Sequence, residues 1–200
     1  MSVDSNMNHK PDISKANTCP PLPIGASLLD KVVYWLGIGL GSGLPKRAPG
    51  TWGTLGGLII AIPLLQLDFL AFFMITMLAS IIGIWICDRT SILMQVHDDP
   101  HIVWDEWAGM WISLLPLSFI LTYVPQYLTL GYYWLAIILS FILFRFFDIA
   151  KPNPIRWADS KVRGGLGIML DDILAGIMSM VAWVMIVASI LSFYPNIYSA

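Results

Sequence analysis

Two long blocks of this sequence contain no charged residue. Residues 107–144 form a block of 38 residues, and residues 173–200 form another of 28. Because a membrane-spanning helix needs about 20 apolar residues, each block is long enough for at least one span. Only 12% of the residues are charged and 57% are hydrophobic, whereas a typical soluble domain has about 25% charged residues. The sequence therefore predicts an all-α integral membrane protein.

The apolar segments predict a helical bundle of about four to six membrane helices. Four spans are expected, over residues 69–87, 107–123, about 128–144 and 173–194. Two more segments, 54–67 and 28–40, are either short tilted spans or a re-entrant hairpin packed against the rest. The first would be about 21 Å long as a helix, and the second begins with Asp30 and Lys31.

The composition changes near residue 25. Residues 1–25 are polar and contain four prolines, without the apolar core and cleavage site of a secretory signal, so they are expected to form a flexible tail. Residues 26–200 are expected to form a single membrane-embedded domain. The chain has 11 basic and 13 acidic residues, and this lack of positive excess argues against a nucleic-acid partner.

After residue 45, the charged residues gather in three short stretches, 46–47, 88–106 and 145–172, with Asp68 as the exception. Counting the expected spans places all three stretches on one side of the membrane; if the first short segment is re-entrant, only the last two must share a side. Together they carry eight Lys and Arg residues, whereas the opposite turns, 66–68 and 124–131, carry none. Because positive loops favour the cytoplasm, the charged face is expected there.

Pairs of carboxylates adjoin the expected spans. Asp105 and Glu106 directly precede one span, and Asp171 and Asp172 directly precede another. A charge at bilayer depth costs about 2.5–3.5 kcal/mol, so acids there usually have a partner or a function. Carboxylate oxygens with few histidines favour Mg²⁺ over zinc. We interpret the four residues as candidate Mg²⁺ ligands; the alternative is that they only anchor the helix ends.

The segment before Asp105 is predicted to start a helix at Asp99, as an N-cap residue followed by proline. His101 and Asp105 would then lie on one helix face, where they could meet a single ion. His97 and Asp98 would precede this helix in a loop. They are the candidates for positioning or deprotonating a water molecule.

Positive residues lie close to these acids in the sequence. Cations beside a Mg²⁺ site suit phosphate chemistry, and a site at the membrane surface suits a phosphorylated lipid. The glycine-rich segments 41–54 and 164–172 could offer backbone N–H groups to a phosphate. The alternative for the positive residues is simple anchoring at lipid headgroups. The candidates for phosphate binding are Lys46, Thr51, Arg145, Lys151 and Arg156.

Four blocks of the sequence resemble phosphatidylglycerophosphatase A, a family of bacterial membrane phosphatases. They are GSGLPKRAPGTWGTLGG (41–57), VHDDPHIVWDEWAGMW (96–111), FRFFDIAKPNPIRW (144–157) and GGLGIMLDDILAG (164–176). The resemblance covers about residues 28–190. It implies Mg²⁺-dependent hydrolysis of phosphatidylglycerophosphate to phosphatidylglycerol and phosphate, at the cytoplasmic face of the bacterial inner membrane. It also implies a set of active-site residues: His97, Asp98, Asp105, Glu106, Asp148, Lys151, Asp171 and Asp172, with Asp148 added to the metal ligands.

Two other functions fit parts of the pattern. A CDP-alcohol phosphotransferase-like lipid enzyme also gathers acids at a cytoplasmic membrane face, but its DGxxAR…GxxxDxxxD pattern is absent. A small ion-coupled transporter would place carboxylates near the middle of the membrane, whereas Asp68 is the sole charge within the apolar stretches. The sequence leaves open whether water attacks the phosphate directly or a phosphoenzyme forms.

Overall fold

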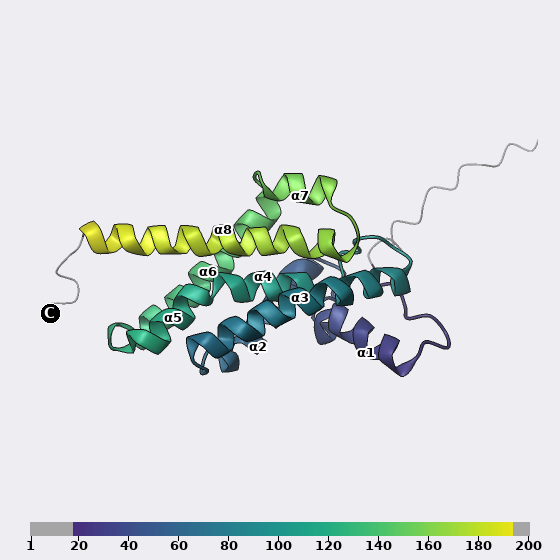
Figure 1. Ribbon diagram of the computed structural model, residues 1–200, viewed down its shortest axis with the longest axis horizontal. Helices are drawn as coiled ribbons and strands as arrows, with labels where there is room; N and C mark the ends of the chain where they lie inside the picture. The colour runs from purple at the N-terminus through teal and green to yellow at the C-terminus, as the bar shows by residue number, and fades with distance from the viewer. Residues whose placement is uncertain (1–17, 194–200) are drawn as a thin grey trace, which may run out of the picture.

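The structure, a computed structural model, describes residues 18–193, so most of the expected tail over residues 1–25 and the last residue of the expected span 173–194 lie outside it (Figure 1). Within this part the chain forms helices and no strand, which confirms the predicted all-α class. The α-helices are α1 (Leu28–Gly37), α2 (Pro49–Leu64), α3 (Phe69–Met94), α4 (Trp104–Ser113), α5 (Leu115–Tyr123), α6 (Leu130–Ala150), α7 (Ile155–Lys161) and α8 (Gly164–Phe193). Two short 3-10 helices, η1 (Gly39–Gly41) and η2 (Pro125–Tyr127), complete the described chain.

Three helices, α3, α6 and α8, are long and apolar enough to cross a membrane, with 26, 21 and 30 residues. Large apolar side chains on their surfaces, such as Ile81, Ile142 and Met185, are exposed, as expected of helices that face lipid. The chain therefore has the character of a membrane protein. α2, with 16 residues, is apolar but shorter.

The expected span 107–123 is not one helix. The chain bends at Leu114, between α4 and α5. Pro116 lies in the first turn of α5, where its missing N–H and its ring interrupt the helical hydrogen bonding that would continue from α4. The last long helix also differs from expectation, because α8 starts at Gly164 and already includes Asp171 and Asp172.

Two of the charged stretches, 88–106 and 145–172, meet at one end of the bundle. α1 packs against α3 there, with Asp30 paired to Arg89 at 2.7 Å. At the other end, Asp68 caps α3 by accepting from the N–H of Ala71, and the Phe69 N–H donates to the hydroxyl of Thr122. The two ends of the bundle thus have different chemistry, one charged and one closed by short polar caps.

α8 is the central element of the bundle. It packs against α3, α4, α6 and α7, and Figure 1 shows it running along the length of the molecule. The α4–α8 contact is unusually close, because a Cβ at Gly176 would lie 2.5 Å from the carbonyl oxygen of Gly109. A Cβ at Gly109 would in turn lie 2.7 Å from the carbonyl oxygen of Asp172. Small residues allow such backbone contact between membrane helices, and this contact brings the start of α4 to Asp172.

We expect Gly176→Ala to lower the free energy of unfolding by about 1–3 kcal/mol, because the methyl group would push the α4 and α8 backbones apart. Thermal melting in detergent measures the effect. Gly131→Ala is the control, since a Cβ there would meet only the hydroxyl of Thr129, at 3.9 Å. Equal melting temperatures for the two variants would contradict the proposed role of the α4–α8 contact.

Candidate active site

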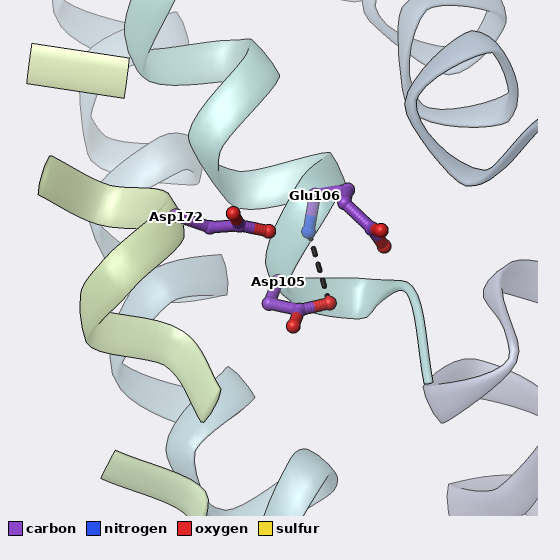
Figure 2. A group of neighbouring side chains, drawn as sticks. All are labelled: Asp105, Glu106 and Asp172. Atoms are coloured by element: carbon purple, nitrogen blue, oxygen red, sulfur yellow. Dashed lines mark hydrogen bonds between the residues drawn. The ribbon is translucent and has the colours of Figure 1, made fainter. Parts of the chain in front are cut away.

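Three carboxylates converge where α4 meets α8. Asp105 and Glu106 come from the first turn of α4 and Asp172 from α8, and one oxygen from each lies within 4.8 Å of the others. Figure 2 shows Asp172 reaching from α8 toward the turn that carries Asp105 and Glu106. The three residues are only 8%, 9% and 3% exposed. Such a group is costly to bury without a cation.

Few protein groups satisfy these carboxylates. Asp105 accepts a hydrogen bond from the backbone N–H of Glu106, at 3.0 Å. Within residues 18–193, no salt bridge reaches Asp105 or Asp172, and the buried Oε2 of Glu106 has no hydrogen-bond partner. The donor set consists of hard oxygen atoms, which fits Mg²⁺ and similar divalent cations. These three residues are therefore the strongest candidate metal ligands.

Arg145 lies beside this group, on α6. Its Nη1 pairs with Asp148 at 2.6 Å, lies 4.0 Å from Oε1 of Glu106, and donates to the Thr54 hydroxyl at 3.1 Å. Asp148, an expected metal ligand, thus pairs with Arg145 and lies outside the three-residue group, although its side chain borders that of Asp172. Thr54 was missed because nothing in its sequence context distinguishes it from the other small residues of its glycine-rich segment.

Lys151 organises a second set of acids nearer the solvent. Its ammonium group pairs with Asp171 at 2.9 Å and with Asp159 at 2.7 Å. Burial alone would lower the pKa of Lys151, but hydrogen bonds to these two carboxylates outweigh it and raise the pKa, so the lysine stays charged. Asp171 therefore belongs with Lys151, although its second oxygen is buried without a partner. Asp159, on α7, was not predicted as a site residue.

The loop before α4 differs from the sequence prediction. α4 begins at Trp104, and Asp99 does not cap it. Instead, Asp99 accepts from the backbone N–H of His101 at 3.0 Å and pairs with its Nδ1 at 2.6 Å. Such local side-chain bonds compete with helix formation. The expectation that His101 and Asp105 share a helix face is therefore wrong.

His97 and Asp98 lie in this same loop. The Nε2 atom of His97 accepts from the backbone N–H of Gly164 at 3.2 Å, and Asp88 accepts from that of Gly165 at 3.0 Å. The glycine-rich start of α8 is thus already occupied by side chains and does not present these two donors to a phosphate. Burial of its carboxyl group raises the pKa of Asp98; nearby Asp159 raises it further, although Lys151 opposes the shift.

The remaining predicted residues lie farther from these contacts. Lys46 and Arg156 are exposed, and in the described part of the chain neither forms a salt bridge. Thr51 is half-buried in the first turn of α2. The structure thus joins Arg145 and Lys151 to the acids, and shows no contact that joins Lys46 or Arg156 to them.

Comparison with known proteins finds relatives over most of the chain. The sequence model of the family described as phosphatidylglycerophosphatase A matches residues 35–187. The chain is 44% identical to phosphatidylglycerophosphatase A of Haemophilus influenzae, over 78% of this chain and 88% of the relative. It is 41% identical to the Escherichia coli protein of the same name, over 73% and 78%. A protein of Bacteroides thetaiotaomicron, named provisionally as a phosphatidylinositol-3-phosphatase, is 38% identical over 73% and 87%. No solved structure matches the chain.

We expect Asp172→Asn to affect thermal stability differently with and without Mg²⁺. In excess chelator, the amide relieves repulsion among three buried carboxylates, so the melting temperature should be no lower than that of the wild type. With Mg²⁺, binding stabilises the folded wild type, whereas the variant should gain much less. Melting curves in detergent over a Mg²⁺ series measure both effects.

Asp159→Asn is the matched control for this experiment. It also removes one carboxylate charge, but from the exposed pair with Lys151. It should keep the Mg²⁺-dependent gain in melting temperature. The same gain in Asp172→Asn would remove Asp172 from the candidate metal ligands.

Proposed function

The chain belongs to the phosphatidylglycerophosphatase A family, and from this premise we propose that it hydrolyses phosphatidylglycerophosphate to phosphatidylglycerol and phosphate in a Mg²⁺-dependent reaction. Its family membership makes it a phosphatase. The observation that carries the rest is the buried group of Asp105, Glu106 and Asp172, with Arg145 beside it and Lys151 paired to the adjacent Asp171. A transporter is not favoured, because the chain's family is one of enzymes.

In this proposal, Asp105, Glu106 and Asp172 hold the metal ion. Bound there, Mg²⁺ supplies Lewis-acid stabilisation of a phosphoryl group and of the charge that develops on it. Arg145 and Lys151 attract the phosphate through their charge, and the buried Nε of Arg145 is a donor without a partner. Fixed donors of this kind stabilise phosphoryl transfer.

We assign the remaining roles to His97 and Asp98 in the loop before α4, and to Asp148 and Asp171. Asp98 has a raised pKa, which suits a group that takes a proton from the attacking water. His97 already accepts a hydrogen bond from Gly164, so its proposed part is to hold this loop against the start of α8. Asp148 orients Arg145, and Asp171 orients Lys151, through the two ion pairs at 2.6 and 2.9 Å.

We further propose a location in the bacterial inner membrane, with α3, α6, α8 and the α4–α5 pair crossing it and the site at the cytoplasmic end. The positive residues support this orientation, because Arg89, Arg145 and Lys151 all lie at the site end. The turns at the opposite end, 66–68 and 124–131, contain no Lys or Arg. This asymmetry is the positive-inside pattern.

The purified protein should release phosphate from phosphatidylglycerophosphate in detergent micelles only when a divalent cation is present. Excess chelator should abolish release, and excess Mg²⁺ should restore it. Phosphatidylinositol 3-phosphate serves as the comparison substrate, because one relative is named for it. Full activity in chelator would contradict the proposed metal requirement. Phosphate release from phosphatidylinositol 3-phosphate but not from phosphatidylglycerophosphate would contradict the proposed substrate.

A cysteine at Ser160, exposed on α7, should resist a membrane-impermeant thiol reagent in intact cells and react after the inner membrane is opened. A cysteine at Gln126, exposed in η2 at the opposite end, should react in intact cells. Both variants need a background in which Cys19 and Cys87 are replaced by alanine. Labelling of the Ser160 position in intact cells would reverse the proposed orientation.

A further inference from the structure

The first turn of α2 forms one wall of the candidate metal centre. A Cβ at Gly50 would overlap Oε1 of Glu106, and a Cβ at Gly53 would lie 3.1 Å from Oε2. The Glu106 carboxylate thus lies against a face of α2 that carries only hydrogen atoms at these two positions. Any side chain at Gly50 would occupy the space that the carboxylate now fills.

This wall restricts where the Glu106 carboxylate can lie, because short polar contacts to the carboxylate are few. Its Oε2 is buried with no hydrogen-bond partner, and Oε1 has Arg145 at 4.0 Å, too far for a hydrogen bond. With one long ion pair and no hydrogen bond to Oε2, the carboxylate depends strongly on packing for its position. The residue on the other side of the contact therefore limits how the carboxylate can approach Asp105 and Asp172.

The first turn of α2 is itself held in place. Thr54 donates its hydroxyl hydrogen to the Gly50 carbonyl at 2.9 Å, and the same hydroxyl accepts from Arg145 at 3.1 Å. Arg145 is fixed in turn by Asp148 at 2.6 Å. The wall is thus tied to α6 by a chain of hydrogen bonds and an ion pair.

We propose that Gly50 is a positioning residue of the metal centre: by lacking a side chain, it lets the first turn of α2 hold the Glu106 carboxylate in the place where it binds the ion. The inference rests on the proposed metal site. It concerns the affinity for the ion, and it makes no use of the phosphate substrate.

Gly50 offers a substitution that separates the metal centre from the fold. A methyl group at Gly50 would meet the end of a flexible side chain, so Glu106 can move aside at little cost to stability. At Gly53 a methyl group would also overlap Val103, a β-branched side chain that cannot yield easily. Gly50→Ala is therefore expected to displace the ligand and leave the bundle intact.

The test measures Mn²⁺ binding to the full-length wild type, Gly50→Ala and Gly131→Ala by electron paramagnetic resonance, with melting in chelator. Gly131 is the matched control, because it occupies the second position of α6 as Gly50 does of α2. We expect Gly50→Ala to raise the Kd for Mn²⁺ about 10–100-fold, the range seen when residues that support a ligand are changed. Its melting temperature in chelator should match that of the control.

The variant Glu106→Asp supplies an internal check, because its shorter side chain withdraws the carboxylate from Gly50. The loss of affinity in Gly50→Ala/Glu106→Asp should be smaller than the product of the two single losses, which is the signature of direct coupling. An unchanged Mn²⁺ affinity in Gly50→Ala would overturn the proposed role of Gly50 and leave the metal site standing. The same conclusion would follow if the loss in the double variant equalled the product of the two single losses. A wild type that binds no Mn²⁺ would overturn the proposed metal site and this inference together.

Discussion

Like-charged groups buried at a helix contact control the organisation of this molecule. Asp105, Glu106 and Asp172 repel one another in a medium that screens poorly, yet the α4–α8 contact through Gly109 and Gly176 holds them together. A cation that binds the three carboxylates would replace this repulsion with attraction to a shared ion. The free energy of binding would then add to the stability of the folded state. The α4–α8 contact therefore both forms the centre of the bundle and positions the three carboxylates of the candidate site.

The charged residues around these three carboxylates form two clusters that differ in net charge. Arg145 and Asp148 neutralise each other, whereas Lys151 is shared between Asp159 and Asp171, which leaves one negative charge in excess. Neither cation is free in the structure, since each already has a carboxylate partner. An incoming phosphate must therefore compete with these carboxylates, and neutralisation of the inner acids would make that competition easier.

Much of the fold follows from local sequence patterns, and the exceptions have local or tertiary causes. The uncharged apolar segments predict α3, α6 and α8, and acids beside these segments predict the group of Asp105, Glu106 and Asp172. The bend at Leu114 was not predicted, because Pro116 lies within an otherwise continuous apolar segment that favours a single helix. The late start of α4 depends on the bond between Asp99 and His101. The hydrogen bond between Thr54 and Arg145 could not be predicted, because the two residues are far apart in the sequence and meet only in the folded bundle.

The two halves of α8 are supported unequally. Its first half lies against α3 at Gly165 and against α4 at Gly176, whereas its second half borders an apolar pocket of about 600 Å³, lined by Phe69, Phe73 and Trp183 among others. α8 is thus in close backbone contact with its neighbours at the site end and borders an apolar pocket at the other. Lipid that enters this pocket would contact α8 away from the carboxylates. One long helix can in this way carry a closely packed polar centre at one end and a lipid-facing surface at the other.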